Sequence, residues 1–417
     1  MMSKKTPQIR FKGFTDDWVQ RKLGDLIEEK WIVRQSDGNH GNLYPRSEEF
    51  VDSGVPYVAA SNISSDGNSI DFSTVKYLPQ SRADLFKKGV AFDGDILLAH
   101  NATVGPALRL HTSFDKVILS TTLTLYRVDS EKIDPDFFLQ NLRSSKFQNQ
   151  LFETMKQSTR NQVPILTQQK LSISITSNLD EQERIGKLLT LLDDLIAANQ
   201  RKLDLLKEQK KGYLQKMFPK NGAKVPELRF AGFADDWEER KLKDIAQFNP
   251  KTVLPDEFEY VDLESVVGTE MISHRTESKD QAPSRAQRLA QKGDVFYQTV
   301  RPYQMNNYLY DLPYDNYVFS TGYAQMRPNI DSYFLLNSVQ NKQFVQQVLD
   351  RSTGTSYPAI NSSDLSNIEI HVPSKLSEQQ KIGAFFQSID DTIALHQRKL
   401  DLLKEQKKGF LQKMFVS

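Results

Sequence analysis

Two pairs of neighbouring carboxylates are the first residues in this sequence that could do chemistry. Asp16 and Asp17 precede a tryptophan, and Asp235 and Asp236 precede another. Paired acids could bind a metal ion or transfer protons. Each pair, however, follows a Gly-Phe dipeptide and leads into an Arg-Lys-Leu segment, which favours a role in capping a helix N-terminus. Because Trp18 and Trp237 repeat with them, we expect these rings in hydrophobic cores or helix staples rather than in a site.

Two Glu-x-Lys triplets could belong to a nuclease, at Glu208–Lys210 and at Glu405–Lys407. A nuclease site also needs an upstream Pro-Asp on a strand, which is absent, so we interpret both triplets as surface charge. The segment Asn249-Pro250-Lys251-Thr252 comes nearest to the Asn-Pro-Pro-aromatic tetrad of a DNA amino-methyltransferase and does not match it. The sequence also lacks a phosphate-binding P-loop, a Gly-x-Gly-x-x-Gly loop, a His-Glu-x-x-His motif and a Gly-x-Ser-x-Gly elbow.

Composition argues in the same direction. The chain has no cysteine, which excludes disulfides and thiolate metal sites and fits a reducing compartment. Its histidines are scattered, and no pair has the spacing of metal ligands on one helix: His40, His100, His111, His274, His371 and His396. No apolar run is long enough to cross a membrane and the first residues lack an apolar signal core, so we expect a cytoplasmic protein. The sequence therefore indicates recognition rather than catalysis, with no metal in this chain.

The elements that must position recognition residues are short strands. Runs rich in β-branched and aromatic residues are separated by Gly, Pro, Asn and Asp, as in 95–99, 116–120, 122–128, 316–320 and 368–372. Helical patterns cover Pro135–Met155 and Ser332–Leu349. With 417 residues, two domains are expected, and each is predicted to be a mixed α/β (α+β) domain.

An internal repeat organises the whole chain. Residues 7–26 read PQIRFKGFTDDWVQRKLGDL, and residues 226–245 read PELRFAGFADDWEERKLKDI. Residues 200–218 and 397–415 are identical except that Tyr213 is replaced by Phe410. Between these ends the two copies diverge, apart from echoes such as Gly94-Asp95 against Gly293-Asp294 and Ser120-Thr121 against Ser320-Thr321. The ends of each copy are thus fixed while the middle varies.

The repeated segment predicts a long helix with a coiled-coil seam, because its apolar positions alternate in steps of three and four. About 37 residues at 1.5 Å each give a rod of roughly 55 Å. We expect the two helices to pair with each other, antiparallel, around a pseudo-two-fold axis. The predicted seam positions are Ile185, Leu188, Leu192, Leu195, Asn199, Leu203 and Leu206 in the first copy, and Ile382, Phe385, Ile389, Thr392, His396, Leu400 and Leu403 in the second.

Two features of these helices leave alternatives open. Asn199 and His396 occupy equivalent seam positions, where they could fix the register as a buried polar pair or lie solvated at the edge of the seam. The basic stretch RKLDLLKEQKKG occurs twice and is interrupted by Asp and Glu in each copy. It could be a solvated face, bind a partner or contact nucleic acid.

The repeat predicts five segments in the order domain, helix, linker, domain, helix. The first recognition domain would cover residues 1–178 and the central spacer helix 179–218. A linker at 219–225 would precede the second domain at 226–375 and the C-terminal spacer helix at 376–417.

The Arg-Phe-x-Gly-Phe-x-Asp-Asp-Trp motif and the duplicated segment that begins LDEQERIGKLLTLLDDLIAANQRKLDLLKEQKKG resemble the specificity subunit of type I restriction–modification systems. The resemblance covers almost the whole chain in order, spacing and duplication. One departure is small: Ser377 replaces the acidic residue Asp180 of the first copy.

The resemblance implies a subunit without catalytic activity whose two target-recognition domains each read one half of a gapped DNA sequence. The helices would set the gap and dock two methyltransferase subunits. S-adenosylmethionine would then bind those subunits, while ATP and magnesium would bind motor-nuclease subunits, and none of these cofactors would bind this chain. Double-stranded DNA and both kinds of subunit are the expected partners, and a membrane is not.

Residues that read DNA should be Arg, Asn, Gln, Ser or Thr on loops. Three loops of each domain qualify, and their equivalent placement in both copies is the reason to prefer them, although the same residue types also make ordinary turns. In the first domain the candidates are His100, Asn101, Thr103, Ser120, Thr121, Thr122, Arg160, Asn161 and Gln162. In the second they are Gln298, Thr299, Arg301, Ser320, Thr321, Ser352, Thr353, Thr355, Ser356 and Tyr357.

Two other classes of function remain. A coiled-coil scaffold could use its variable domains to bind proteins, in which case an assembled complex would show no sequence-specific DNA binding. A self-sufficient methyltransferase or nuclease would have to act as a purified chain, and the missing cofactor loop argues against it.

Overall fold

The structure, a computed structural model, describes residues 6–158, 161–220 and 222–416. The chain divides into two compact units. The first combines residues 1–201 with residues 398–417, and the second contains residues 202–397. Each unit therefore holds one variable domain together with part of each long helix. No helix among the described residues is long and apolar enough to cross a membrane.

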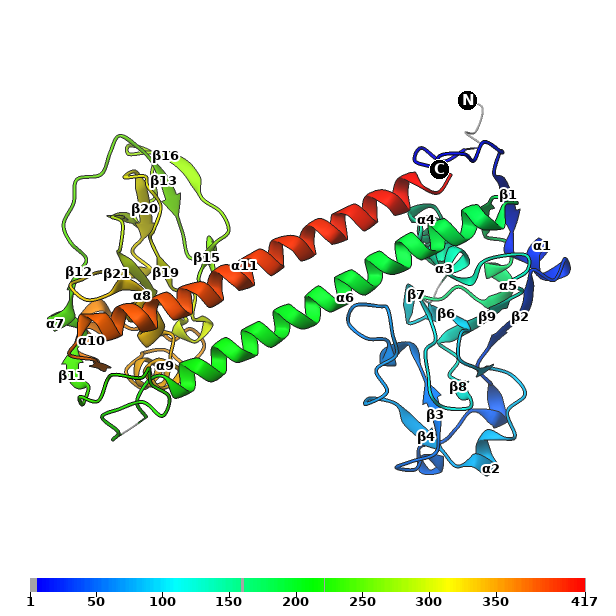
Figure 1. Cartoon of the computed structure of the whole chain (residues 1–417), viewed down its shortest axis with the longest axis horizontal. Helices are drawn as coiled ribbons and strands as arrows, with labels where there is room; N and C mark the ends of the chain where they lie inside the picture. Colours follow the sequence, from blue (N-terminus) through cyan, green and yellow to red (C-terminus); the bar gives the residue numbers. More distant parts are fainter. Residues whose placement is uncertain (1–5, 159–160, 221, 417) are drawn as a thin grey trace. The chain divides into compact units, whose positions relative to one another are not determined.

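The first unit contains two four-stranded sheets with strand orders β2-β9-β6-β7 and β4-β3-β8-β5, and a separate β1-β10 pair (Figure 1). Within the second sheet, β3 and β8 are parallel, and the other pairings are antiparallel. The strands are β1 Val19–Lys22, β2 Ile32–Asp37, β3 Val55–Val58, β4 Lys76–Leu78, β5 Val90–Ala91, β6 Ile96–Asn101, β7 Thr103–Arg109, β8 Val117–Leu119, β9 Leu123–Val128 and β10 Ser172–Ile175. The helices are α1 Leu23–Glu28, α2 Gln80–Ala83, α3 Pro135–Arg143, α4 Ser145–Lys156 and α5 Ile165–Gln168, with short 3₁₀ turns η1 Gly41–Leu43, η2 Ser47–Glu49 and η3 Ala60–Asn62.

The second unit repeats this plan, with sheets β12-β21-β18-β19 and β16-β13-β20-β17 and a β11-β22 pair. Its strands are β11 Glu238–Lys241, β12 Ala246–Phe248, β13 Glu257–Val261, β14 Val266–Val267, β15 Glu270–Met271, β16 Arg275–Ser278, β17 Ala286–Leu289, β18 Val295–Gln298, β19 Tyr308–Leu309, β20 Tyr317–Ser320, β21 Tyr323–Pro328 and β22 Glu369–Val372. Its helices are α7 Leu242–Ile245, α8 Ser332–Val339, α9 Lys342–Asp350 and α10 Ser362–Ser366, and η4 is Pro302–Gln304. The prediction of two mixed α/β domains is confirmed.

The long helices are α6, Leu179–Lys216, and α11, Leu376–Lys413. In the first unit the beginning of α6 packs against the end of α11, and Lys407 forms an ion pair with Asp193. In the second unit the end of α6 packs against the beginning of α11, and Lys210 lies 2.6 Å from Asp390. The predicted antiparallel pairing is thus present in each unit, and the two ion pairs occupy equivalent positions of the repeat.

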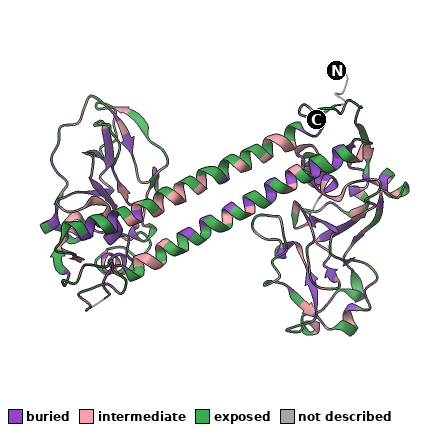
Figure 2. Ribbon diagram, in the orientation of Figure 1, coloured by how far each residue is buried: buried purple, intermediate pink, exposed green. Residues whose placement is uncertain are grey.

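Buried residues recur along α6 between exposed ones (Figure 2). Most of its predicted seam positions are buried, namely Ile185, Leu192, Asn199, Leu203 and Leu206. Two positions differ: Ile196 is 7% exposed whereas Leu195 is 39% exposed, and Leu189 is fully buried while Leu188 is only partly buried. A straight helix has 3.6 residues per turn, so its buried stripe drifts away from a strict 3.5-residue repeat. The start of α6 also enters the domain core, which widens its buried face beyond a two-helix seam. For the same reason Phe386 is fully buried in α11 and Phe385 only partly.

The two polar seam positions have different environments. Asn199 is buried, and its side-chain amide donates a hydrogen bond of 2.7 Å to the carbonyl of Leu195 in the same helix. His396 is partly buried, and its Nδ1 has no hydrogen-bond partner within the part of the chain that the structure describes. Asn199 is therefore not solvated, although it bonds to its own helix.

The repeated Glu-Gln-x-x-Ile-Gly motif docks each long helix onto its domain. Glu181 accepts a hydrogen bond of 2.9 Å from Arg10, and Gln182 accepts one of 2.9 Å from the backbone of Asp134, the N-cap of α3. A Cβ on Gly186 would collide with Asp134, so only glycine permits this approach. The second unit has the equivalent contacts. Glu378 binds Arg229, Gln379 accepts from the backbone of Asp331, and Gly383 lies against Asp331.

The residues that directly follow each long helix complete a domain core. Phe415 packs edge-on against Trp18 in the first unit, with 6.1 Å between ring centroids, and Phe218 packs in the same way against Trp237 in the second. Both tryptophans are buried, which confirms their predicted place in the cores. The predicted capping role of the neighbouring aspartates is wrong, because β1 and β11 intervene and the N-caps of α1 and α7 are Lys22 and Lys241.

Candidate nucleic-acid interface

Three loops of the first domain, all predicted from the sequence, meet at the end of β6. The backbone N–H of His100 donates to the carbonyl of Thr122 over 3.0 Å. The carbonyl of His100 in turn accepts from the N–H of Val163 over 2.8 Å. These backbone bonds fix the loop after β6, the loop before β9 and the segment before α5 in one cluster.

The second domain assembles its three predicted loops with the same backbone bonds. The N–H of Thr299 donates to the carbonyl of Gly322 over 2.9 Å, and the carbonyl of Thr299 accepts from Ile360 over 3.0 Å. The hydroxyl of Thr299 adds a second bond of 2.8 Å to Gly322. The two domains thus share a loop frame although the side chains on it differ.

One position of this frame has a left-handed backbone in both domains. Ala102 has φ 61° and Arg301 has φ 53°. Non-glycine residues rarely adopt this conformation, which costs on the order of 1–3 kcal/mol and persists where surrounding contacts impose it. Here the N–H of Ala102 donates to Asn161 over 3.0 Å, and the N–H of Arg301 donates to Pro358 over 2.7 Å. The third loop therefore holds the strained residue in each copy.

Five candidate side chains are buried: His100, Ser120, Gln298, Thr299 and Ser320. Nδ1 of His100 lies 2.9 Å from the hydroxyl of Thr124, and burial lowers the pKa of this imidazole below 6.5. The hydroxyl of Ser120 lies 2.6 Å from that of Thr122. Burial and these internal bonds show that the five side chains support the loops, and a contact of theirs with a ligand stays a prediction.

The other described candidates reach the surface. Arg160 lies outside the described residues. Those classed as exposed are Thr103, Asn161, Thr353, Thr355, Ser356 and Tyr357, and those partly exposed are Asn101, Thr121, Thr122, Gln162, Arg301, Thr321 and Ser352. Tyr357 is 69% exposed, and the guanidinium of Arg301 lies 5.5 Å from the centre of its ring. Nε of Arg301 has no hydrogen-bond partner among the described residues. Arg301 and Tyr357 together form an open, cationic and aromatic surface.

An ion pair with a buried aspartate lies at the start of the strand that carries each cluster, and the sequence patterns did not predict it. Arg127 makes two bonds of 2.7 Å to Asp95, and Arg327 binds Asp294 over 2.8 and 2.9 Å. Each aspartate is almost fully buried and follows a glycine at the start of β6 or β18. The repeated Gly-Asp dipeptide was visible in the sequence, but its arginine partner could be found only by pairing strands.

The comparisons with known proteins agree with this duplicated architecture. The sequence model of the type I restriction modification DNA specificity domain matches twice, at residues 15–208 and 234–405. The chain belongs to this family. It is a DNA specificity subunit of the type I restriction–modification class, whose members are not catalytic.

Relatives of this specificity subunit include a Methanocaldococcus jannaschii protein assigned as the MjaX type I restriction enzyme specificity subunit. The two are 23% identical over 420 residues, which cover 95% of this chain and 92% of the relative. The HindI specificity subunit of Haemophilus influenzae is 25% identical over 196 residues, covering 43% of this chain and 41% of the relative.

Two solved structures share the fold of this specificity subunit. The S subunit of a type I restriction–modification system from M. genitalium aligns with a TM-score of 0.64 at 15% identity, over 99% of both chains. A chain from a structural study of complex assembly and conformational transition of the type I R-M system aligns with a TM-score of 0.52 at 18% identity, over 97% of this chain and 98% of the other.

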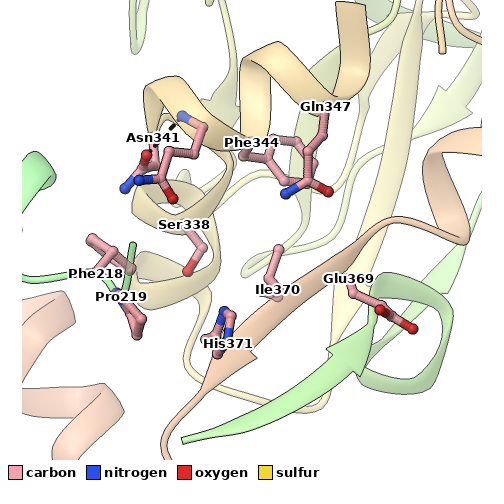
Figure 3. Close-up of a pocket in the computed structure, with 10 residues that line it drawn as sticks. Phe218, Pro219, Ser338, Asn341, Phe344, Gln347, Glu369, Ile370 and His371 are labelled. Atoms are coloured by element: carbon pink, nitrogen blue, oxygen red, sulfur yellow. Dashed lines mark hydrogen bonds between the residues drawn. The ribbon is translucent and has the colours of Figure 1, made fainter. Parts of the chain in front are cut away.

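The second unit of the specificity subunit has a further cavity at the end of α6. A cavity of about 50 Å³ lies where Pro219 follows α6, beside α9 and β22 (Figure 3). Asn341 at this junction donates a bond of 3.0 Å to the carbonyl of Leu214, which ties α9 to α6. Within the described ranges, no three His, Asp or Glu side chains are grouped so that they could hold a metal ion.

Proposed function

We propose that the two domains each read one half of a gapped DNA sequence, and that α6 and α11 set the distance between the halves. The observation that carries this proposal is the shared loop frame with different side chains. Backbone bonds from His100 and Thr299 build the same cluster twice, while the residues presented on it differ. Divergent readers on a repeated frame suit two different half-sites, because half-site spacing mirrors the separation of the reading units.

The loops have the chemistry that base reading requires. Exposed amide and hydroxyl side chains such as Asn161 and Ser356 can donate and accept hydrogen bonds at base edges in the major groove. Arg301 can bind a guanine through two parallel hydrogen bonds, which is the commonest specific contact. An aromatic ring such as that of Tyr357 can support the guanidinium through a cation–π contact. The backbone hydrogen bonds at His100 and Thr299 hold the loops of each domain together, so recognition would not have to order them.

The chain would act with partner subunits. We propose that two methyltransferase subunits dock on the long helices and bring S-adenosylmethionine, and that motor-nuclease subunits bring ATP and magnesium. Methylation requires the target base to be flipped out of the duplex. The specificity subunit would hold the DNA on both sides of that base while the partner performs the chemistry.

A domain exchange tests this proposal. Residues from about 30 to 175 would be replaced by the corresponding domain of another specificity subunit, and the methylated sequence would be mapped for the assembled complex. Only one half of the target should change, and the gap should stay the same. A change in both halves would contradict independent reading by the two domains. The control exchanges the corresponding part of the second unit, which should change only the other half.

A further inference from the structure

Each unit contains a groove between a long helix and its recognition domain, lined by lysines from the helix. In the second unit the groove has a volume of about 310 Å³ and is lined by Lys207, Lys210 and Lys211 of α6, with Lys342 at the start of α9. No carboxylate belongs to the described residues that line this groove. The groove is therefore a concentrated positive surface on a chain whose net charge is only +1.

The first unit has an equivalent groove, with a volume of about 560 Å³. It is lined by Lys404, Lys407 and Lys408 of α11, which match Lys207, Lys210 and Lys211 in the repeat. Arg143 adds a cation, and Asp66 and Asp193 are the acidic residues in its lining. Both grooves thus have the same lysine wall, which comes from the nearly identical helical segment.

The opposite wall differs between the copies. In the second unit it includes Gly268, Thr269, Gln304 and Met305, and in the first unit it includes residues 65, 66 and 68. A surface that reads sequence should vary between the two half-sites, whereas a surface that contacts the phosphate backbone carries no sequence information and has no reason to vary. The lysine wall is the same in both units, as expected for a surface that contacts the phosphate backbone.

The three helix lysines of each groove divide into an inner anchor and two outer cations. Lys210 is tied to Asp390 over 2.6 Å, and Lys407 is tied to Asp193. The outer lysines are exposed. Among the residues that the structure describes, Lys211 and Lys408 pair with glutamates one turn earlier on the same helix, at 3.2 and 3.6 Å. Exposed pairs of this kind contribute at most about 1 kcal/mol, so a phosphate can replace the glutamate at little cost.

The groove of the second unit is also connected to the candidate reading loop. Arg301 is the N-cap of η4, and Gln304 at the end of this turn lines the groove. Gln304 also accepts a bond of 2.9 Å from the buried Gln298 at the end of β18. A DNA duplex that contacts Arg301 would therefore lie beside the groove, and its phosphate backbone would face the lysines.

We infer that the two lysine grooves are sites for the DNA backbone, each holding phosphates next to the half-site that its own domain reads. The inference rests on the proposed function and adds a binding site to it. Lysine suits this task because it meets a phosphate as a point charge.

The dependence of DNA binding on salt tests the inference. In the complex assembled with its methyltransferase subunits, Lys207→Gln and Lys211→Gln would be combined, and affinity for a duplex that carries the mapped target would be measured between about 50 and 200 mM salt. Each lost phosphate contact removes about 0.9 from the slope of log K against log salt, so the slope should become less steep by about 1.8. The preferred sequence should stay the same. Lys404→Gln with Lys408→Gln should have the same effect.

The matched control is Lys202→Gln with Lys216→Gln, two exposed lysines of α6 outside the groove. An unchanged slope in the Lys207/Lys211 variant would overturn the inference. A second result would also overturn it: the variant complex loses its methyltransferase subunits while the salt slope of DNA binding is unchanged. The groove would then bind a methyltransferase subunit rather than DNA. If the unmodified complex itself shows no sequence preference, the proposed function fails, which is a separate result.

Discussion

Ala102 and Arg301 occupy the same left-handed backbone position in the two recognition domains, with φ 61° and 53°. Each residue is held there by its N–H, which donates to the third loop of its own domain. The strain is therefore retained in both copies while the side chain changes from a methyl group to a guanidinium. Such a position supplies a fixed direction from which a variable side chain can approach a ligand.

We expect Arg301→Ala to relax recognition at one base pair of one half-site. A bidentate contact to guanine contributes about 1–3 kcal/mol of discrimination, and alanine already occupies this backbone position in the first domain. Binding of the assembled complex to duplexes substituted at each base pair in turn will measure the effect. Arg351→Ala is the control, because Arg351 is exposed and its Nη1 donates to the carbonyl of Gln347 in the preceding helix α9. Unchanged discrimination in the Arg301 variant would remove this residue from the reading surface.

The residues that follow the two long helices should stabilise different units, with Phe415 in the core of the first and Phe218 in the core of the second. Phe415 packs on Trp18 and Phe137, so Phe415→Ala should destabilise the first unit although the substitution lies at the C-terminus. Replacing a buried phenylalanine by alanine costs about 3–5 kcal/mol. Hydrogen exchange followed by mass spectrometry should show faster exchange in β6 and β9 and little change in β18 and β21.

Phe218→Ala is the matched variant, because Phe218 packs on Trp237 and Phe334 in the second unit. It should produce the opposite pattern, with faster exchange in β18 and β21. If both variants loosened both domains equally, the division of the core between two independent units would be incorrect.

The buried His100 predicts a pH dependence for the first unit. Burial lowers the pKa of this imidazole below 6.5, with the nearby Asp37 opposing the shift and His40 adding to it. Between the folded pKa and 6.5 the unfolded chain binds more protons than the folded one, so stability rises with pH in this window. The contribution is present above pH 6.5 and is lost as the pH falls through that value.

Thermal unfolding of the chain at about pH 7.5 and about pH 5.5 will measure this effect. The drop in melting temperature of the first unit on acidification should be smaller in His100→Asn, which can still bond to Thr124 but does not titrate. An identical drop in both proteins would show that other groups cause the pH dependence.

Lengthening both helices should lengthen the gap between half-sites. Seven residues would be inserted after Asn199 in α6 and seven after His396 in α11, because the antiparallel partners must grow together to keep Lys407 with Asp193 and Lys210 with Asp390. Each insertion adds about 10.5 Å of helix, which corresponds to at most about three base pairs. Mapping of the methylated sequence will give the new gap. An unchanged gap would exclude the helices as the spacer.

The sequence was sufficient for features that are local or repeated. The duplication, the two long helices and the three loops of each domain follow from short patterns, and the structure brings those loops together around His100 and Thr299. Features that depend on strand pairing were out of reach. The Asp95–Arg127 pair needs the register of β6 against β9, and no sequence spacing reveals it.

Burial was the second limit of the sequence analysis. Leu195 and Ile196 are consecutive apolar residues, and only the packing of α6 shows that Ile196 is the buried one. The aspartates before Trp18 and Trp237 looked like helix caps, but a short strand separates them from the next helix. Among the loop candidates, Ser120 and Ser320 have the residue type of a base reader and are nevertheless buried.

The central claim is that this chain chooses the DNA sequence that a methyltransferase complex modifies. Genome-wide mapping of methylated adenines in cells with and without the gene tests it most directly. We predict a two-part sequence with a fixed gap that is methylated in the first cells and unmethylated in the second. Methylation of the same sequences in both would contradict the account.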